Sequence, residues 1–305
     1  MNLTSSNQTV LYGLSRYFND LVKLYQNQRL PNKILFSGKK GIGKSTLAYH
    51  LINFILSERD DFAYDLKNFL INKDNKSFKL IQNGSNPNFN LIDIIDDKKS
   101  IDINQVRNLI NTLNKSSLNS KPRFVLIDNI EFLNDNSTNA LLKIIEEPND
   151  NIYFLLIHNN KKILSTLLSR CLNFKISLSH NASIDVVKKL LDKDIKNFIH
   201  NDILNYYFTP GKIYDLITFS NENNIDLIKL DLKSFLFLLI DNSFYKKDLS
   251  AKNILYDFIE LYLIKNVSIY SSFFNYFLNR IRNTKKFNLD DESLFIEFKY
   301  RLLNE

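Results

Sequence analysis

The sequence predicts an α/β protein with a parallel, doubly wound sheet in its amino-terminal part and helices alone in its carboxy-terminal part. Three observations lead to this fold class. Short apolar segments that suit strands alternate with helix-like segments up to about residue 177. The strand-like segments are apolar almost throughout, as expected where helices cover both faces of a sheet. After about residue 178 the apolar residues recur with helical spacing, and the strand–helix–strand pattern stops.

The composition narrows the class of protein further. The 305 residues correspond to about two domains of roughly 150 residues each. No apolar run reaches the roughly 20 residues of a membrane span, and the start MNLTSSNQTV does not resemble a signal peptide, so a cytoplasmic protein is expected. The single cysteine, Cys171, excludes an internal disulfide and a four-cysteine zinc site. The net charge of +7 permits a polyanionic partner without requiring one.

The first strand is expected at residues 33–37 (KILFS), an apolar run that leads into the sequence GKKGIGKST. The segment LAYHLINFIL then suits a mostly buried helix. Three of the six glycines of the chain lie between residues 38 and 43, which indicates backbone conformations that other residues rarely adopt.

The remaining strands and helices follow from apolar runs and from capping residues. Strands are expected at residues 91–95, 123–128, 151–159 and 171–176. One helix is expected within residues 101–113, where Val106, Leu109, Ile110 and Leu113 have helical spacing. Another is expected from about residue 135, with Asp135, Asn136 or Ser137 as its cap. Pro148 disfavours helix at Glu147 and so ends it.

The glycine-rich loop completes the pattern G-x-x-x-x-G-K-[ST] between a strand and a helix, which is typical of a phosphate-binding loop. Glycines let backbone N–H groups converge on phosphates, and the helix that follows directs its positive end at them. Lys44 is expected to reach the β- and γ-phosphates, and Ser45 to bind Mg²⁺. The residues predicted to contact the nucleotide in this loop are Gly38, Lys39, Lys40, Gly41, Ile42, Gly43, Lys44, Ser45 and Thr46.

Asp128 ends an apolar strand and is the second residue predicted to hold Mg²⁺. The next residue is Asn129, whose amide cannot accept a proton from an attacking water. Glu131 would point to the same side as Asn129 if the strand continued, and we do not expect it to take over as the base. A general base is worth about 10²–10⁴-fold in rate, so hydrolysis by this chain is expected to be slow or absent.

Two further positions have both a structural and a functional interpretation. Arg170, just before the last strand, suits a surface ion pair or an arginine finger that acts on a neighbouring subunit. His158 and Asn159 end a buried strand, where they could sense a γ-phosphate or cap the strand. The spacing by itself favours the structural interpretation of Arg170.

Together these segments resemble the AAA+ clamp-loader family, in particular its delta-prime branch. The resemblance is specific over about residues 8–177. It is carried by RLPNKILFSGKKGIGKSTLA, IDINQVRNL, FVLIDNIEFLNDNSTNALLKIIEEP and STLLSRC, and TPGK at residues 209–212 resembles the second sensor segment of that family.

The resemblance implies a RecA-like AAA+ nucleotide-binding domain (residues 1–177), a helical lid (178–227) and a helical collar for oligomerisation (228–305). It implies binding of ATP with Mg²⁺ at the loop, Asp128 and Asn159, with Lys212 near the second sensor. Arg170 becomes an arginine finger acting in trans. Many relatives hold a zinc ion with four cysteines, and since residues 58–88 contain no cysteine, no zinc is expected here.

The partners implied are the motor (gamma/tau) and delta subunits of the DNA polymerase III clamp loader, the sliding clamp and primed DNA. The chain would assist the ATP-driven loading of that clamp, and no membrane contact is expected. Three alternatives stay open: an ATP-hydrolysing gamma/tau-type motor subunit, a stand-alone enzyme with a phosphate loop such as a small-molecule kinase, and a scaffold whose loop no longer binds nucleotide.

Overall fold

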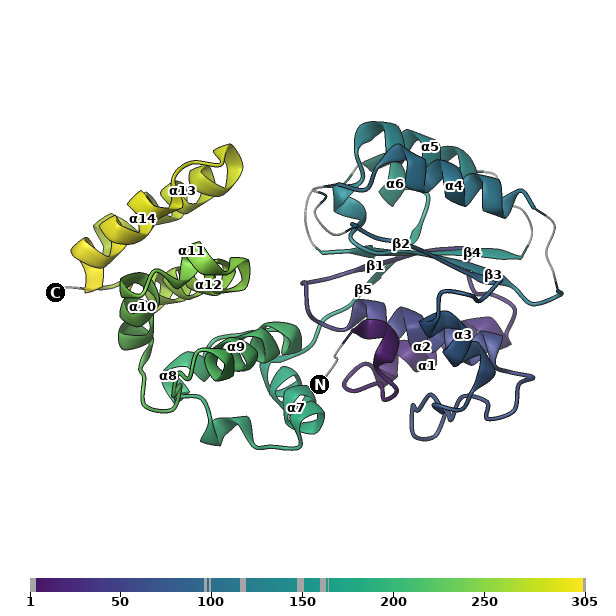
Figure 1. Cartoon of the computed structure of the whole chain (residues 1–305), viewed down its shortest axis with the longest axis horizontal. Helices are drawn as coiled ribbons and strands as arrows, with labels where there is room; N and C mark the ends of the chain where they lie inside the picture. The colour runs from purple at the N-terminus through teal and green to yellow at the C-terminus, as the bar shows by residue number, and fades with distance from the viewer. Residues whose placement is uncertain are drawn as a thin grey trace. The chain divides into compact units, whose positions relative to one another are not determined.

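The computed structural model describes residues 4–95, 98, 100–115, 119–146, 151–159, 163 and 165–303. Contacts divide the chain into two units, Met1–Val186 and Val187–Glu305, drawn together in Figure 1. The predicted change at about residue 178 therefore falls close to the boundary between the units. The further division into a lid (178–227) and a collar (228–305) stays a prediction.

The first unit is built on a five-stranded parallel sheet of order β2-β3-β4-β1-β5. Its strands are β1 (Lys33–Ser37), β2 (Phe89–Ile92), β3 (Arg123–Ile127), β4 (Ile152–His158) and β5 (Leu172–Lys175). The predicted parallel, doubly wound sheet is confirmed. The second strand begins and ends earlier than the predicted 91–95, because its pairing with β3 runs from Phe89 to Ile92.

Helices cover both faces of the sheet (Figure 1). One layer contains α1 (Ser15–Gln26), α2 (Lys44–Leu56) and α3 (Lys76–Gln82), and the other contains α4 (Ile103–Leu113), α5 (Asp135–Glu146) and α6 (Ser165–Leu168). Successive strand residues point to opposite faces. Ile34 and Phe36 therefore join the core under α1–α3, whereas Leu35 joins the core under α4 and α5.

Capping side chains determine where two of these helices begin. Asp102 and Gln105 form a capping box at α4. For α5, the cap is Asn134, whose Oδ1 accepts from the Ser137 backbone N–H at 2.8 Å. The prediction of Asp135, Asn136 or Ser137 was thus wrong by at least one residue. The predicted helix end at Glu147 and Pro148 lies outside the described residues.

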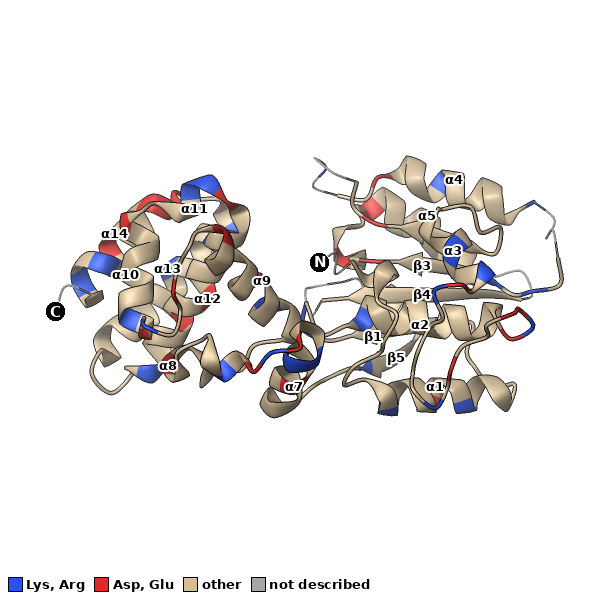
Figure 2. Cartoon of the chain, turned by 60° about the horizontal axis from the view of Figure 1, so that its bottom comes forward, with Lys and Arg blue, Asp and Glu red and all other residues tan. Residues whose placement is uncertain are grey.

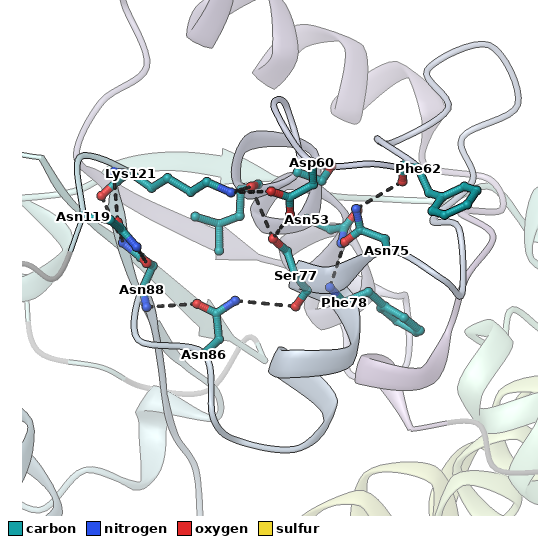
Figure 3. A network of polar contacts seen from close by, with 12 residues as sticks. Asn53, Asp60, Phe62, Asn75, Ser77, Phe78, Asn86, Asn88, Asn119 and Lys121 are labelled. Atoms are coloured by element: carbon teal, nitrogen blue, oxygen red, sulfur yellow. Dashed lines mark hydrogen bonds and ion pairs between the residues drawn. The ribbon is translucent and has the colours of Figure 1, made fainter.

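The segment between α2 and β2 is held by hydrogen bonds among polar side chains (Figure 3). Lys121 Nζ donates to Asp60 Oδ1 at 2.6 Å and to the Leu56 carbonyl at 2.7 Å, and Ser77 Oγ donates to Asp60 Oδ2 at 2.5 Å. Asn75 caps α3 by accepting from the Phe78 N–H. These bonds tie the carboxyl end of α2 to α3 and to the approach to β3.

The regular elements described in the second unit are all helical. After α7 (His180–Leu191), which crosses the boundary, come α8 (Asn201–Leu204), α9 (Pro210–Glu222), α10 (Leu232–Asp241), α11 (Phe244–Lys247), α12 (Leu249–Lys265), α13 (Ser271–Phe287) and α14 (Asp291–Phe298). Five phenylalanines are fully buried in this unit: Phe235, Phe258, Phe277, Phe295 and Phe298. These aromatic residues thus form part of a helical core.

Charged residues are spread over elements of both units, and Lys and Arg do not gather on one element (Figure 2). No helix among the described residues is long and apolar enough to cross a membrane.

Candidate nucleotide-binding site

The glycine-rich loop joins the end of β1 to the first turn of α2. Gly43, the residue before the helix, has φ +98° in the left-handed region, which glycine adopts without steric cost. A Cβ atom on Gly38 would lie 2.4 Å from the Ile176 carbonyl oxygen, so the backbone approach there requires glycine. In the rest of the predicted loop, Lys39, Lys40 and Gly41 are exposed, Ile42 is buried and Thr46 is half-buried. The loop thus adopts the strand–loop–helix geometry that a phosphate site needs.

Lys44 turns back over this loop and is buried. Its Nζ donates to the carbonyls of Gly38 at 2.9 Å and Lys39 at 2.8 Å, and to Asn159 Oδ1 at 2.8 Å. Burial lowers the pKa of the Lys44 ammonium to about 8, although Asp128 and Glu131 act to raise it. The ammonium is therefore placed at the loop and bonded to groups that a phosphate could replace.

Ser45 Oγ donates to Asp128 Oδ2, which joins the two predicted Mg²⁺ ligands. Burial raises the pKa of the Asp128 carboxyl, and the charge of Asp93 adds to the increase, whereas the bond from Ser45 acts against it. A cation beside Asp128 would relieve this unfavourable charge. Mg²⁺ prefers oxygen ligands and is usually held by one or two carboxylates together with substrate phosphates, so the donor set fits Mg²⁺.

Asp93 is the site residue that sequence reasoning missed. It follows β2 directly, and Ile92 of β2 pairs with Ile127 of β3, which precedes Asp128. Asp93 Oδ1 accepts from Asn129 Nδ2 at 2.8 Å and from the Ile94 N–H at 2.7 Å. The sequence signal that could have identified Asp93 is an acidic residue next to each of two strand-like segments, Asp93 and Asp128. The carboxyl ends of parallel strands meet at one edge of a sheet, so such residues lie close together.

Asn159 connects Lys44 to the residues after β3. Besides accepting from Lys44, its Nδ2 donates to Asn129 Oδ1 at 2.9 Å. Asn129 has φ +56°, so the chain leaves the strand and the amide lies between Asp93 and Asn159. His158 is buried, and its carbonyl accepts from the Gly38 N–H at 3.3 Å. The structure therefore places the Asn159 side chain between Lys44 and Asn129.

Glu131 also lies at this edge of the sheet. It belongs to a single 3-10 turn, Ile130–Phe132, and its Oε2 accepts from the Asn159 backbone N–H at 3.3 Å. The strand does not continue past Ile127, so the expectation that Glu131 would follow Asn129 along the strand does not hold.

Arg170 makes its described contacts within the α5–α6 layer. Its Nε donates to Glu146 Oε1 at 2.9 Å, a second guanidinium nitrogen lies 2.7 Å from the same oxygen, and Nη1 donates to the Thr166 carbonyl at 2.8 Å. Lys212 lies in the second unit, in the first turn of α9, where its Nζ is paired with Asp257 of α12. In this chain both cations are engaged in ion pairs.

The described residues hold no group of three or more His, Cys, Asp or Glu side chains that could bind a metal without further ligands. A magnesium ion at Ser45 and Asp128 would accordingly depend on phosphate oxygens.

Comparison with known proteins assigns the chain to a family. A family model described as "DNA polymerase III, delta subunit" matches residues 13–180, more than half of the chain. The DNA polymerase III subunit delta′ of Buchnera aphidicola subsp. Baizongia pistaciae is 34% identical over 147 residues, which cover 46% of this chain and 42% of that protein. The alignment thus spans less than half of this relative.

Two other similarities extend further along the chain. The DNA polymerase III subunit gamma of Buchnera aphidicola subsp. Acyrthosiphon pisum is 27% identical over 293 residues, or 90% of this chain and 76% of that protein. A gamma subunit-related protein of Thermotoga maritima has a similar fold, with a TM-score of 0.51 and 15% identity over 93% of this chain and 98% of that one. On the match to its family model, the chain belongs to the DNA polymerase III delta subunit family.

Proposed function

We propose that this chain is a clamp-loader subunit of the delta-prime type that binds ATP with Mg²⁺ and hydrolyses it slowly. One observation carries the nucleotide part of the proposal. Lys44, Ser45 and Asp128 are arranged at the loop, while the position after Asp128 is an asparagine whose amide is bonded to Asp93 and Asn159.

Each residue of the site would then have a defined task. The β- and γ-phosphates would take the place of the Gly38 and Lys39 carbonyls on the Lys44 ammonium, and the amino end of α2 would face the same charge. Ser45 and Asp128 would hold Mg²⁺, which neutralises charge on the phosphates. Asn159, now bonded to Lys44, would change partner when a γ-phosphate arrives.

Filter retention of radiolabelled ATP tests this proposal, with Lys44→Ala as the site variant and Lys67→Ala as a control for loss of an exposed lysine. Wild type and Lys67→Ala should retain ATP in a Mg²⁺-dependent way, and Lys44→Ala should not. Equal retention by wild type and Lys44→Ala would remove the case for a functional loop and would favour a scaffold.

We extend the proposal to the assembly. Arg170 would act in trans on ATP bound by an adjacent motor (gamma/tau) subunit, in a cytoplasmic complex that also contains the delta subunit and engages the sliding clamp and primed DNA. An arginine finger is worth about 10³–10⁵-fold in hydrolysis rate. Because Arg170 is paired with Glu146, this pair would have to open at the subunit interface.

Reconstitution with the motor and delta subunits tests the role of Arg170. Arg170→Ala should abolish clamp-stimulated ATPase, and Arg170→Lys should restore little of it, because lysine lacks the planar fork of arginine. An unchanged rate in the assembled complex would refute the role in trans. Lys212 is proposed as the second-sensor residue, and Lys212→Ala should then weaken ATP retention.

A gamma-type motor subunit is the second candidate, because the alignment to a gamma subunit covers 90% of this chain. That function predicts rapid hydrolysis by the purified chain, stimulated by DNA and clamp. Asn129 disfavours it, since the usual carboxylate is absent at that position.

A further inference from the structure

Glu131 differs from the other carboxylates at the site because one of its oxygens is buried without a hydrogen-bond partner. The chain turns at Asn129 and enters the 3-10 turn Ile130–Phe132, which carries the Glu131 side chain across to the end of β4. There Oε2 accepts from the Asn159 N–H at 3.3 Å. Oε1 is shielded from solvent and has no hydrogen-bond partner among the described residues.

A shielded carboxylate oxygen without a donor is unusual. Leaving a buried acceptor unsatisfied costs about 1–3 kcal/mol, and more when the group is charged, and such atoms in native proteins call for an explanation in function or in a bound water or ion. Glu131 bears this cost, and its Oε2 accepts from the Asn159 backbone N–H. The Asn159 side chain in turn accepts from Lys44 Nζ. Glu131 is therefore part of the same polar network as the phosphate-binding lysine.

The negative charge of Glu131 also acts on the Lys44 ammonium. Asp128 and, to a smaller extent, Glu131 raise the pKa of that lysine against the effect of burial. Each of the other two carboxylates at this edge accepts two hydrogen bonds, whereas Glu131 accepts one. Asp128 accepts from Ser45 and from the Asn129 N–H, and Asp93 Oδ1 accepts two N–H groups. Glu131 thus supplies the buried acceptor without a donor in the polar network around Lys44.

We propose that Glu131, two residues beyond the usual position, is the general base for the slow ATP hydrolysis of this chain. Water would attack the γ-phosphorus, forming a new P–O bond as the bond to the β–γ bridging oxygen breaks. The proton of that water goes to Glu131 Oε1 and then to solvent, and the bridging electron pair leaves with ADP. This inference rests on the proposed nucleotide site.

Single-turnover hydrolysis of bound ATP tests this role, with ATP retention measured on the same samples. Glu131→Gln keeps the shape of the side chain and removes the base, so the rate should fall about 10²-fold or more while ATP is still retained. Glu131→Asp keeps a carboxylate and should stay measurably faster than Glu131→Gln. Glu58→Gln, the same change at an exposed position of the same unit, should leave the rate unchanged, and Lys44→Ala reports contaminating ATPases.

Measuring hydrolysis and ATP retention together separates a base from a structural residue. Loss of a base should lower the rate of hydrolysis and leave ATP retention unchanged, whereas loss of a structural residue should lower both. ATP retained by wild type but not hydrolysed, or hydrolysed equally fast by Glu131→Gln, would overturn the inference and leave the nucleotide site standing. Loss of ATP retention in Glu131→Gln would also overturn it, by assigning Glu131 to binding. Failure of wild type to retain ATP would overturn both proposals.

Discussion

Replacing Lys121 by methionine should destabilise the first unit by removing the cation of the network in Figure 3. Lys121 Nζ bonds to Asp60 Oδ1 at 2.6 Å and to the carbonyl of Leu56 at 2.7 Å, and Leu56 is the last residue of the helix that begins at the phosphate loop. The side chains of Lys121 and Asp60 are 33% and 13% exposed. Methionine keeps most of the length of lysine and removes the charge.

The expected cost follows from these contacts. After the substitution, Asp60 keeps its bond from Ser77 but loses its cation, and the Leu56 carbonyl loses a donor. A hydrogen bond to a charged group contributes about 1.5–3 kcal/mol, and partial exposure places this pair toward the lower part of that range. We expect about 2 kcal/mol, or roughly 4–8 °C in Tm for a unit of this size.

Thermal unfolding followed by circular dichroism measures this change, and the chain offers a matched control. Lys79 and Asp74 form an ion pair at 2.9 Å with side chains 56% and 69% exposed. Lys79→Met should shift Tm by less than Lys121→Met does, and by less than about 4 °C, since exposed pairs contribute about 0–1 kcal/mol. If Lys121→Met had the same Tm as wild type or as the control variant, the hydrogen bonds of Lys121 would not be what stabilises this segment.

Three other predictions follow from the site and its surroundings. ATP affinity should be highest below about pH 8, which is the pKa of the Lys44 ammonium. Above that pH the affinity should fall by up to about tenfold per pH unit, because the ammonium loses its proton. A flat binding curve from about pH 7 to 10 would contradict this. Gly38→Ala should lower both Tm and ATP retention because the new Cβ meets the Ile176 carbonyl, and wild-type melting with full ATP retention would argue against this close approach. Burial lowers the pKa of His50 to about 4. The neutral imidazole therefore stabilises the fold above pH 6.5, and this contribution is lost as the pH falls from 6.5 to about 4. Over that interval the Tm of His50→Gln should fall less steeply than the Tm of wild type.

Local patterns predicted much of the site. The loop from Gly38 to Ser45 is a continuous stretch whose conformation depends on its own glycines and on the helix that follows. Asp128 was predicted because it ends an apolar strand. In the structure its carboxylate accepts a hydrogen bond from Ser45 Oγ. The apolar runs also predicted the five strands, since burial on both faces leaves little choice of residue.

Other site residues depend on contacts between distant segments. Asp93 lies 35 residues before Asp128 in the sequence numbering and reaches it only because β2 pairs with β3. The direction of Glu131 depends on where β3 stops, and a positive φ at Asn129 decides that. The ion pairs of Arg170 with Glu146 and of Lys212 with Asp257 likewise join different helices.

The amino-acid sequence by itself determined the class of fold, the phosphate loop and the absence of a glutamate after Asp128, because each of these depends on neighbouring residues or on a repeating apolar pattern. Only the tertiary structure decided which polar side chains surround Lys44 and that the buried Glu131 Oε1 lacks a hydrogen-bond partner. Those outcomes depend on the register of the parallel strands and on the turns at their carboxyl ends, where a change of one backbone conformation redirects a side chain to a different partner.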